Sequence, residues 1–347
     1  ISSIKFGPNS KTSAMFFSTK GTIVFDATLE DSIGAINEGK GNGIAFMGNG
    51  DLNYSSADIK IKNYMPVTIE SGAEGMTVFS VHNGGTIENY ADIINNSSSY
   101  VESGRTYGAR ALASYVNEAV MINYGNIDMN GKDAVAFYNG FLLNSESDHA
   151  VINNDNGIVV YSVPSNRGAG GIVSGESNVS ANRLEVNGDN GVVAFSHGGN
   201  INLSPLVTGG TLELTANGLN TYAFYHQRGI YNWNIAGKIK INGTVNANVK
   251  NGGIGMHYTG NGITSSPVNL GTELGNIIDS SGGTLNIITD SDSYNLTLQN
   301  VSVNLSNLSN LNFDNVNFAT QGKAKMYNSG VFIDIDSDID KNNTLGN

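Results

Sequence analysis

Cysteine is absent from the 347 residues of this chain, which excludes disulfide bonds and cysteine metal sites. A chain without thiols is typical of proteins exported through a bacterial periplasm, where stray cysteines become cross-linked. No apolar run approaches the roughly 20 residues that a membrane-spanning helix needs. The first residues also lack a methionine, a basic segment and the apolar segment of a signal peptide. We therefore expect this chain to be a fragment whose targeting information lies elsewhere.

Charged residues are scarce as well, at 14% compared with roughly 25% in an average globular protein. The 18 basic and 30 acidic residues give a net charge of −12, and no basic run occurs. Nucleic acid is excluded as a partner, because its recognition needs clustered Lys and Arg. With only 5 prolines, the turns rest on 44 glycines and about 50 asparagines. The apolar share of 39% is enough to build a core.

The most abundant feature of the chain is a loose internal repeat. A small residue followed by an aromatic or apolar residue recurs at intervals of roughly 24 to 34 residues, within the range of solenoid repeats. Between these pairs, segments such as 120–131 and 233–245 alternate apolar and polar residues around an Asn-Gly step, which predicts strands and sharp corners. The anchor residues are Phe46, Phe79, Leu112, Phe137, Tyr161, Phe195, Phe224 and Met256.

We therefore predict an all-β fold, a right-handed parallel β-helix (β-solenoid) with loop insertions, formed by residues 1–347 as a single segment. Coils about 4.8 Å apart would stack the anchors into an inward ladder and the corner asparagines into an amide ladder. Residues 282–347 are expected to form tighter C-terminal coils, continuous with the rod. The alternatives are a β-sandwich or a propeller, although the hairpin turns and the regular period of a propeller are missing.

Two stretches, 97–119 and 266–283, are predicted as insertions that leave the coil. Tyr and Arg are enriched at interface hot spots, which makes the first stretch the best candidate for a contact surface. The alternative is that its tyrosines cover the core of the rod beneath a long loop. The candidate binding residues in this stretch are Tyr100, Arg105, Tyr107, Arg110 and Tyr115.

No catalytic residue, no cofactor and no metal site is predicted. The GDSGS-type nucleophile segment of serine proteases is missing, since GESN at 175–178 lacks the glycine after the serine. A glycan hydrolase needs two carboxylates about 5 to 10 Å apart, and no such acid pair stands out.

Two groups of residues were considered as metal ligands. Four histidines follow anchors and are interpreted as polar residues at strand exits, although the last three could form a stripe. Four alternating aspartates share one strand face, but their spacing does not fit an EF-hand, so a solvated edge is expected instead of a calcium site. These residues are His82, His197, His226 and His257, and Asp334, Asp336, Asp338 and Asp340.

The repeats resemble the passenger domains of monomeric (type Va) autotransporters. INYGNIDMNG (122–131) and GDNGVVAFSHGGNI (188–201) are most similar to the large fusobacterial outer-membrane adhesins. SGVFIDIDSDIDKNNTLGN (329–347) is similar to the segment that closes many passengers before the translocating barrel. The resemblance implies export through the outer membrane, display on the bacterial cell surface or release from it, and membrane attachment only through a C-terminal barrel that this sequence lacks.

The expected function is therefore that of a non-catalytic adhesin segment. Its partner would be a protein or glycan on the surface of a host cell or of another bacterium. Two alternatives stay open at this point. One is a β-helical polysaccharide lyase or hydrolase, and the other is a ligand-free stalk that spaces a binding tip located elsewhere in a longer protein.

Overall fold

The computed structural model describes most of the chain between residues 59 and 299. Backbone and side chains are described for 60–81, 84–101, 103–115, 118–164, 172–227, 237–259 and 278–299. Only the backbone is described for strands β1–β5 and β30–β33 and for residues 59, 82, 102, 165 and 166. No helix occurs among these residues, and hence none that could cross a membrane.

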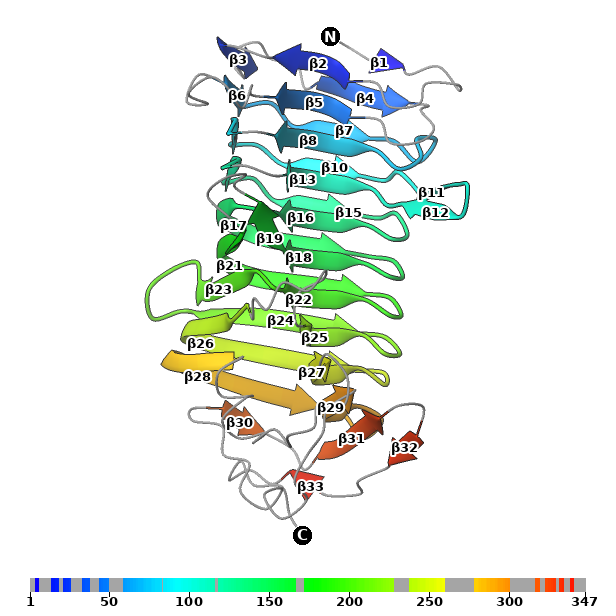
Figure 1. Cartoon of the computed structure of the whole chain (residues 1–347), viewed down its shortest axis with the longest axis vertical. Coiled ribbons are helices and arrows are strands. Elements are labelled where there is room, and N and C mark those ends of the chain that lie inside the picture. The colour runs from blue at the N-terminus through cyan, green and yellow to red at the C-terminus, as the bar shows by residue number, and fades with distance from the viewer. Residues whose placement is uncertain are drawn as a thin grey trace.

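The strands wind into a rod with the N-terminus at one end and the C-terminus at the other (Figure 1). Successive coils add strands to three columns, which we call columns A, B and C. In several coils a single long strand bends through both column A and column B, which merges these two columns into one sheet of 16 strands.

Column A contains β3 (Gly21–Phe25), β6 (Ile59–Asn63), β9 (Thr86–Asn89), β14 (Val120–Asn123) and β23 (Asn200–Pro205). Column B contains β1 (Ile4–Lys5), β4 (Ile33–Asn37), β7 (Val67–Ile69), β10 (Ile93–Asn95), β15 (Ile127–Met129), β24 (Thr211–Asn217) and β30 (Val316–Phe318). The strands that run through both columns are β17 (Leu142–Ile152), β21 (Glu176–Asn187), β26 (Ile239–Lys250) and β28 (Ile278–Thr289).

Column C forms the second large sheet. It contains β2 (Ala14–Ser18), β5 (Ile44–Asn49), β8 (Thr77–His82), β13 (Arg110–Tyr115), β16 (Val135–Asn139), β18 (Ile158–Ser162), β22 (Val192–His197), β25 (Tyr222–Gln227), β27 (Ile254–Thr259), β29 (Tyr294–Gln299) and β31 (Gly322–Asn328).

Strands of successive coils pair in parallel throughout the three columns. The antiparallel pairs in the described chain lie outside this winding. They join β11 (Tyr100–Glu102) to β12 (Arg105–Tyr107), β19 (Pro164–Asn166) to β20 (Ile172–Ser174), and β31 to β32 (Val331–Ile333) and β33 (Asp338–Ile339). The predicted all-β parallel β-helix is confirmed, and the sandwich and propeller alternatives are wrong.

The inward ladder of column C is built from most of the predicted anchors, which pack in register between coils. Its described side chains are at most 2% exposed: Phe79, Leu112, Phe137, Val160, Ala194, Phe224 and Met256. Phe46 is in register with Phe79, and its side chain lies outside the described residues.

Two predicted anchors, Tyr161 and Phe195, are corrected by the structure. Phe137, the core residue of β16, pairs with Val160 of the next coil. Val160 in turn pairs with Ala194 of the coil after that. Tyr161 and Phe195 therefore lie one position further along, on the outer face. The error arises because the aromatic residue ends an apolar run in GIVVY and GVVAF, and such a run hides the alternation that would assign its face.

The coils differ in length more than the repeat predicted. Side chains that bond between adjacent coils are 23 residues apart at Asn130 and Asn153, and 40 apart at His257 and Thr297. Residues 260–277 lie between β27 and β29 in the sequence and outside the described residues, as does most of the insertion predicted at 266–283. Its last part, from Ile278 onward, belongs to strand β28 and is not an insertion.

Asparagine side chains link the coils at the corners, as predicted. Between columns A and B, the fully buried amides of Asn63, Asn89 and Asn123 form a ladder in which Nδ2 donates to the next Oδ1 at 2.7 and 2.8 Å. The same Nδ2 of Asn89 also donates to the carbonyl of Ala91 at 2.7 Å. Each amide therefore satisfies both a neighbouring coil and its own turn.

A second, exposed ladder follows the corner between columns B and C. Its hydrogen bonds of 2.6 to 3.2 Å join Asn96, Asn130, Asn153, Asn187, Asn217 and Asn251 in series. The left-handed residues of this corner also stack, with φ between 54° and 58° at Asp133, Asn156, Asn190 and Asn220.

Glycine has a different role from asparagine in the Asn-Gly steps of this corner. Asn156 and Asn190 adopt the left-handed conformation, whereas Gly157 and Gly191 follow them at sites without room for a side chain. A Cβ on Gly191 would lie 2.3 Å from Cγ1 of Val186. The dipeptide thus combines a tolerated left-handed turn with a close approach to the core.

Candidate contact surface

The predicted contact residues divide between two parts of the structure. Tyr100, Arg105 and Tyr107 lie on the hairpin of β11 and β12, which stands out from the side of the rod (Figure 1). Arg110 and Tyr115 lie at the two ends of β13, within column C. The predicted insertion is therefore one hairpin followed by a strand of the rod.

The hairpin turns through Ser103 and Gly104, whose φ values of 52° and 75° are typical of a tight two-residue turn. The rings of Tyr100 and Tyr107 face each other across it, with centroids 6.3 Å apart. Val101 is 64% exposed, and Arg105 is exposed as well. The hairpin thus presents apolar, aromatic and cationic groups together, a composition that suits a protein or glycan contact.

Arg110 and Tyr115 begin a row of rings on the outer face of column C. The Cζ atom of Arg110 lies 5.4 Å from the ring centroid of Tyr115 and 5.1 Å from that of Tyr138, and its Nη1 donates to the Tyr115 hydroxyl. Consecutive rings then follow from coil to coil with centroids 4.5 to 5.3 Å apart. We call this row the outer aromatic column: Tyr115, Tyr138, Tyr161, Phe195, Tyr225 and His257.

The outer position of Tyr115 differs from the alternative in which the tyrosines cover the core. Column C already has a complete inner ladder at Leu112 and Phe137, and Tyr115 is half-buried on the opposite face. The outer aromatic column was missed from the sequence because Tyr161 and Phe195 were assigned to the core. Successive side chains of a strand point to opposite faces. Counting from the fully buried Phe137 and Phe224 would therefore have placed the aromatic residue after each of them on the outer face.

Burial sets the protonation of the polar groups in the outer aromatic column and beside it. It lowers the pKa of the Arg110 guanidinium and raises the pKa values of the Tyr138 and Tyr161 hydroxyls, which stay protonated at neutral pH. Burial also lowers the pKa of His197 to about 4, so this imidazole is neutral. The hydroxyl oxygen of Tyr161 lies 2.9 Å from its Nδ1. When this hydroxyl donates, the ring hydrogen lies on Nε2 of His197.

The three histidines that were considered as a possible stripe lie in three different columns of side chains. His257 is in register with Tyr225, and His197 is in register with Gln227. His226 instead faces the interior, where its Nε2 lies 2.8 Å from the carbonyl of Gly237. Within the described ranges, no three His, Asp or Glu side chains are arranged to hold a metal ion. The side chain of His82 lies outside those ranges.

His257 should make the stability of its coils depend on pH. Burial lowers its pKa from 6.5 to about 4 in the folded chain, so the unfolded chain takes up the proton first as pH falls. The contribution is complete above pH 6.5 and is lost towards pH 4, by roughly 2–4 kcal/mol. An NMR titration should place the midpoint of the ring near pH 4. His257→Gln should reduce the pH dependence of unfolding in this window, and a midpoint near 6.5 would contradict the expected shift.

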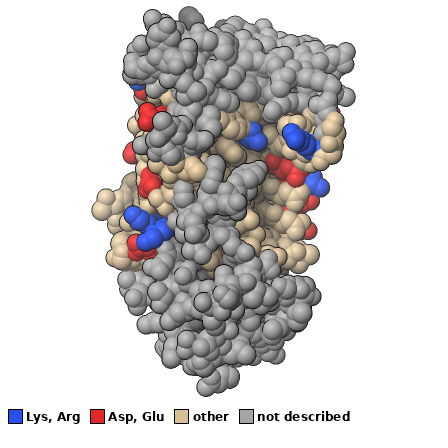
Figure 2. All heavy atoms as spheres, in the orientation of Figure 1, with Lys and Arg blue, Asp and Glu red and all other residues tan. Residues whose placement is uncertain are grey.

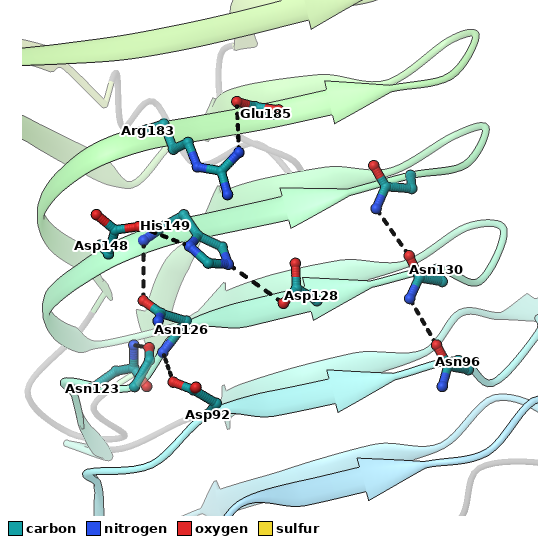
Figure 3. Close-up of polar contacts among 12 residues, drawn as sticks. Asp92, Asn96, Asn123, Asn126, Asp128, Asn130, Asp148, His149, Arg183 and Glu185 are labelled. Carbon is teal, nitrogen blue, oxygen red and sulfur yellow. Dashed lines mark hydrogen bonds and ion pairs between the residues drawn. The ribbon is translucent and has the colours of Figure 1, made fainter.

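The outer face of column B carries charged and polar side chains that the sequence did not single out (Figure 3). Nε2 of His149 lies 3.4 Å from Asp128, and its Nδ1 lies 3.0 Å from Asp148. On the next coil, Arg183 pairs with Glu185 at 3.4 Å. A hydrogen bond from Asn182, followed by one from His149, lowers the pKa of Asp148. These groups are paired with one another, which is the ordinary state of a solvated sheet face.

A stack of tyrosines lies just beyond the buried asparagine ladder. Tyr64 and Tyr90 have centroids 4.6 Å apart, and Tyr90 and Tyr124 are 5.1 Å apart, with nearly parallel rings. The sequence contains a signal for this stack, because Asn-Tyr occurs at the same corner in three successive coils. Tyr90 and Tyr124 are 39% and 45% exposed.

Two lysines and a tyrosine surround the carboxylate of Glu88 beside this stack. Lys60 and Lys62 pair with opposite oxygens of Glu88, and the Tyr90 hydroxyl lies 3.1 Å from Oε2. Burial acts to raise the pKa of Glu88, but the hydrogen bonds from Lys60, Lys62 and Tyr90 outweigh it and lower the pKa. The carboxylate of Glu88 is therefore fully paired, and the two lysines leave the group with a net charge of +1.

Charges of both signs are scattered over the described part of the face seen in Figure 2, in small groups rather than in one patch. Asp338 is described by its backbone alone, and the other aspartates of the predicted edge, Asp334, Asp336 and Asp340, lie outside the described residues. The described geometry offers two surfaces that a ligand could contact: the projecting hairpin and the outer aromatic column.

The chain was compared with protein-family models, with curated proteins and with solved structures, and none of them matches it. The similarity to autotransporter passengers therefore stays a prediction from the repeat pattern.

Proposed function

We propose that this chain is a rigid, non-catalytic segment of a bacterial surface adhesin that binds host cells or partner bacteria. The observation that carries the proposal is the hairpin of β11 and β12. It projects from an otherwise regular rod and exposes Val101 and Arg105 beside the paired rings of Tyr100 and Tyr107. A projecting turn on a rigid scaffold is where binding residues commonly lie.

The rest of the rod supports a presenting role. Each described coil is joined to the next by backbone pairing, asparagine ladders and a continuous core, so a load on one coil is shared with its neighbours. Display on the cell surface is part of the proposal. It is supported by the absence of cysteine and by the resemblance of the repeats to exported passengers.

A cell-binding assay tests this function directly. Beads coated with the 347-residue chain should adhere to epithelial cells or to partner bacteria. A hairpin variant carries Tyr100→Ser, Val101→Ser and Arg105→Ser. Its adhesion should fall at least about tenfold, because hot spots concentrate binding energy. The matched control carries Val207→Ser and Leu219→Ser, which change exposed apolar residues elsewhere on the rod.

The outcomes separate the competing functions. Loss in the hairpin variant with full adhesion of the control supports an adhesin with its contact at the hairpin. Equal adhesion of the hairpin variant and the unmodified chain would contradict that contact. Failure of the unmodified chain to adhere to any cell would contradict the adhesive function and favour a stalk.

A further inference from the structure

Arg110 carries a positive charge that no carboxylate balances within the described part of the chain. The ion pairs there involve Lys60, Lys62, His149 and Arg183. Arg110 instead lies over two tyrosine rings, and its Nε is buried without a hydrogen-bond partner. Burying a guanidinium without a counter-charge is costly, so such a group is well placed to receive an anion from outside.

A second unsatisfied group lies on the same outer face. His197 is 6% exposed, and its Nε2 is buried without a hydrogen-bond partner. Its Nδ1 lies 2.9 Å from the Tyr161 hydroxyl oxygen, and in the tautomer in which this hydroxyl donates, the hydrogen on Nε2 has no acceptor. A neutral N–H donor of this kind fits the hydroxyl or carbonyl oxygen of a ligand.

Aromatic rings fill the space between these two donors. Arg110 is on β13 and His197 is on β22, and β16 and β18 lie between these strands. Three steps at the usual strand spacing separate the two residues by about 14 Å along the rod. Tyr138 and Tyr161 occupy the two intervening coils, at 5.3 Å and in an edge-to-face arrangement. The face thus offers a cation at one end, rings in the middle and an N–H donor at the other end.

We propose that this face binds a glycan that carries a single carboxylate, as in an acidic sugar. Arg110 would bind the carboxylate through its planar fork, and the outward edges of the Tyr138 and Tyr161 rings, whose faces are covered by Arg110 and Phe195, would contact the C–H groups of the sugar rings. The Nε2 hydrogen of His197 would donate to an oxygen of the neighbouring sugar. The inference shares with the proposed function the premise that the chain binds a surface ligand, but its site differs from the hairpin.

Charge decides between a single carboxylate and a polyanion. The chain has a net charge of −12, so a polymer with many negative charges is repelled while one carboxylate beside an unpaired arginine is attracted. In the view of Figure 2, the described basic side chains are scattered and form no extended patch. A glycan is favoured over an acidic peptide because β16 and β18 are paired on both sides, which leaves no free sheet edge for a peptide strand to join.

Calorimetric or NMR titration of the 347-residue chain tests this inference. The acidic probes are 3′-sialyllactose and glucuronate, each with one carboxylate, and the neutral probe is lactose. At least one acidic probe should bind at least tenfold more tightly than lactose. Arg110→Gln should weaken that binding at least tenfold, and Arg110→Lys should weaken it less because it keeps the charge but not the fork. His197→Gln should also weaken it.

The matched control is Arg183→Gln, which removes an arginine from the outer face of column B and should leave binding unchanged. Equal binding of lactose and the acidic probes would overturn the inference. So would the absence of binding at millimolar concentration, or equal losses in Arg183→Gln and Arg110→Gln. If Arg110→Gln does not fold, Arg110→Lys and the chemical shifts of His197 during titration give the same decision.

Two further results would assign the outcome. If a Glu-rich peptide binds in an Arg110-dependent way while neither acidic probe does, the ligand is a peptide and the glycan proposal is wrong. If the chain adheres to cells but binds no acidic probe, the glycan proposal fails while the proposed function stands. Loss of both would contradict both.

Discussion

Phe137→Ala is expected to lower the free energy of unfolding of its coils by about 3–5 kcal/mol, the usual cost of emptying a core site of a large aromatic ring. Phe137 is fully buried between Leu112 and Val160 in the inner ladder of column C. A rod of stacked coils limits collapse around the cavity, because its backbone is held by pairing on both sides. The change is best measured by denaturant unfolding combined with hydrogen exchange, since the coils of a solenoid unfold in part independently.

Phe195→Ala is the matched comparison, because it removes the same ring from the outer face. Phe195 is half-buried and in register with Tyr161 and Tyr225, so we expect a cost of about 1–2 kcal/mol from lost ring contacts and partial burial. Equal losses for the two variants would mean that Phe195 lies in the core. The assignment of inner and outer faces in column C would then be wrong.

Asn89→Ala is expected to cost about 2–4 kcal/mol, because it leaves several buried polar groups without partners at once. The amide of Asn89 accepts from Asn63 and donates to both Asn123 and the carbonyl of Ala91. All three asparagines of the ladder are fully buried, so water cannot replace the lost bonds. Hydrogen exchange should show loss of protection in β6, β9 and β14 together.

Asn153→Ala provides the control for the same chemistry in a solvent-exposed ladder. Asn153 donates to Asn130 and accepts from Asn187 at the exposed corner, where water can satisfy the remaining groups. We expect a loss of about 0.5–1 kcal/mol. A loss at Asn153 as large as that at Asn89 would contradict the view that burial, and not the ladder itself, sets the energy.

The sequence was sufficient to predict the winding of the chain and much of its corner chemistry. Alternation around the Asn-Gly steps predicted strands and corners, and the asparagine ladders follow from placing amides one above another. Six of the eight anchors, including Phe137 and Phe224, were assigned to the correct position, because register keeps equivalent residues aligned. The physical reason is that coil stacking repeats one local geometry many times.

The faces of individual side chains were harder to predict where apolar residues run together. Tyr161 and Phe195 each follow at least two apolar residues. The alternation of apolar and polar residues, which would assign each side chain to the inner or the outer face, is therefore missing there. This single ambiguity hid the outer aromatic column, and with it the unpaired charge of Arg110 beside Tyr138. The hairpin at 100–107 was recognised only as part of a longer insertion, since the strand that follows it from Arg110 is equally rich in Tyr and Arg.

The central structural claim is that equivalent residues of adjacent coils lie in register. Disulfide trapping tests it cleanly, because the chain has no cysteine of its own. Asn144 pairs with Asn178 on the next coil, and Asn178 pairs with Asn202 on the coil after that. Asn144→Cys with Asn178→Cys should oxidise readily at a Cα separation of about 5 Å, whereas Asn144→Cys with Asn202→Cys, at about 10 Å, should not. Equal cross-linking of the two pairs, or cross-linking of the distant pair alone, would contradict the stacked register.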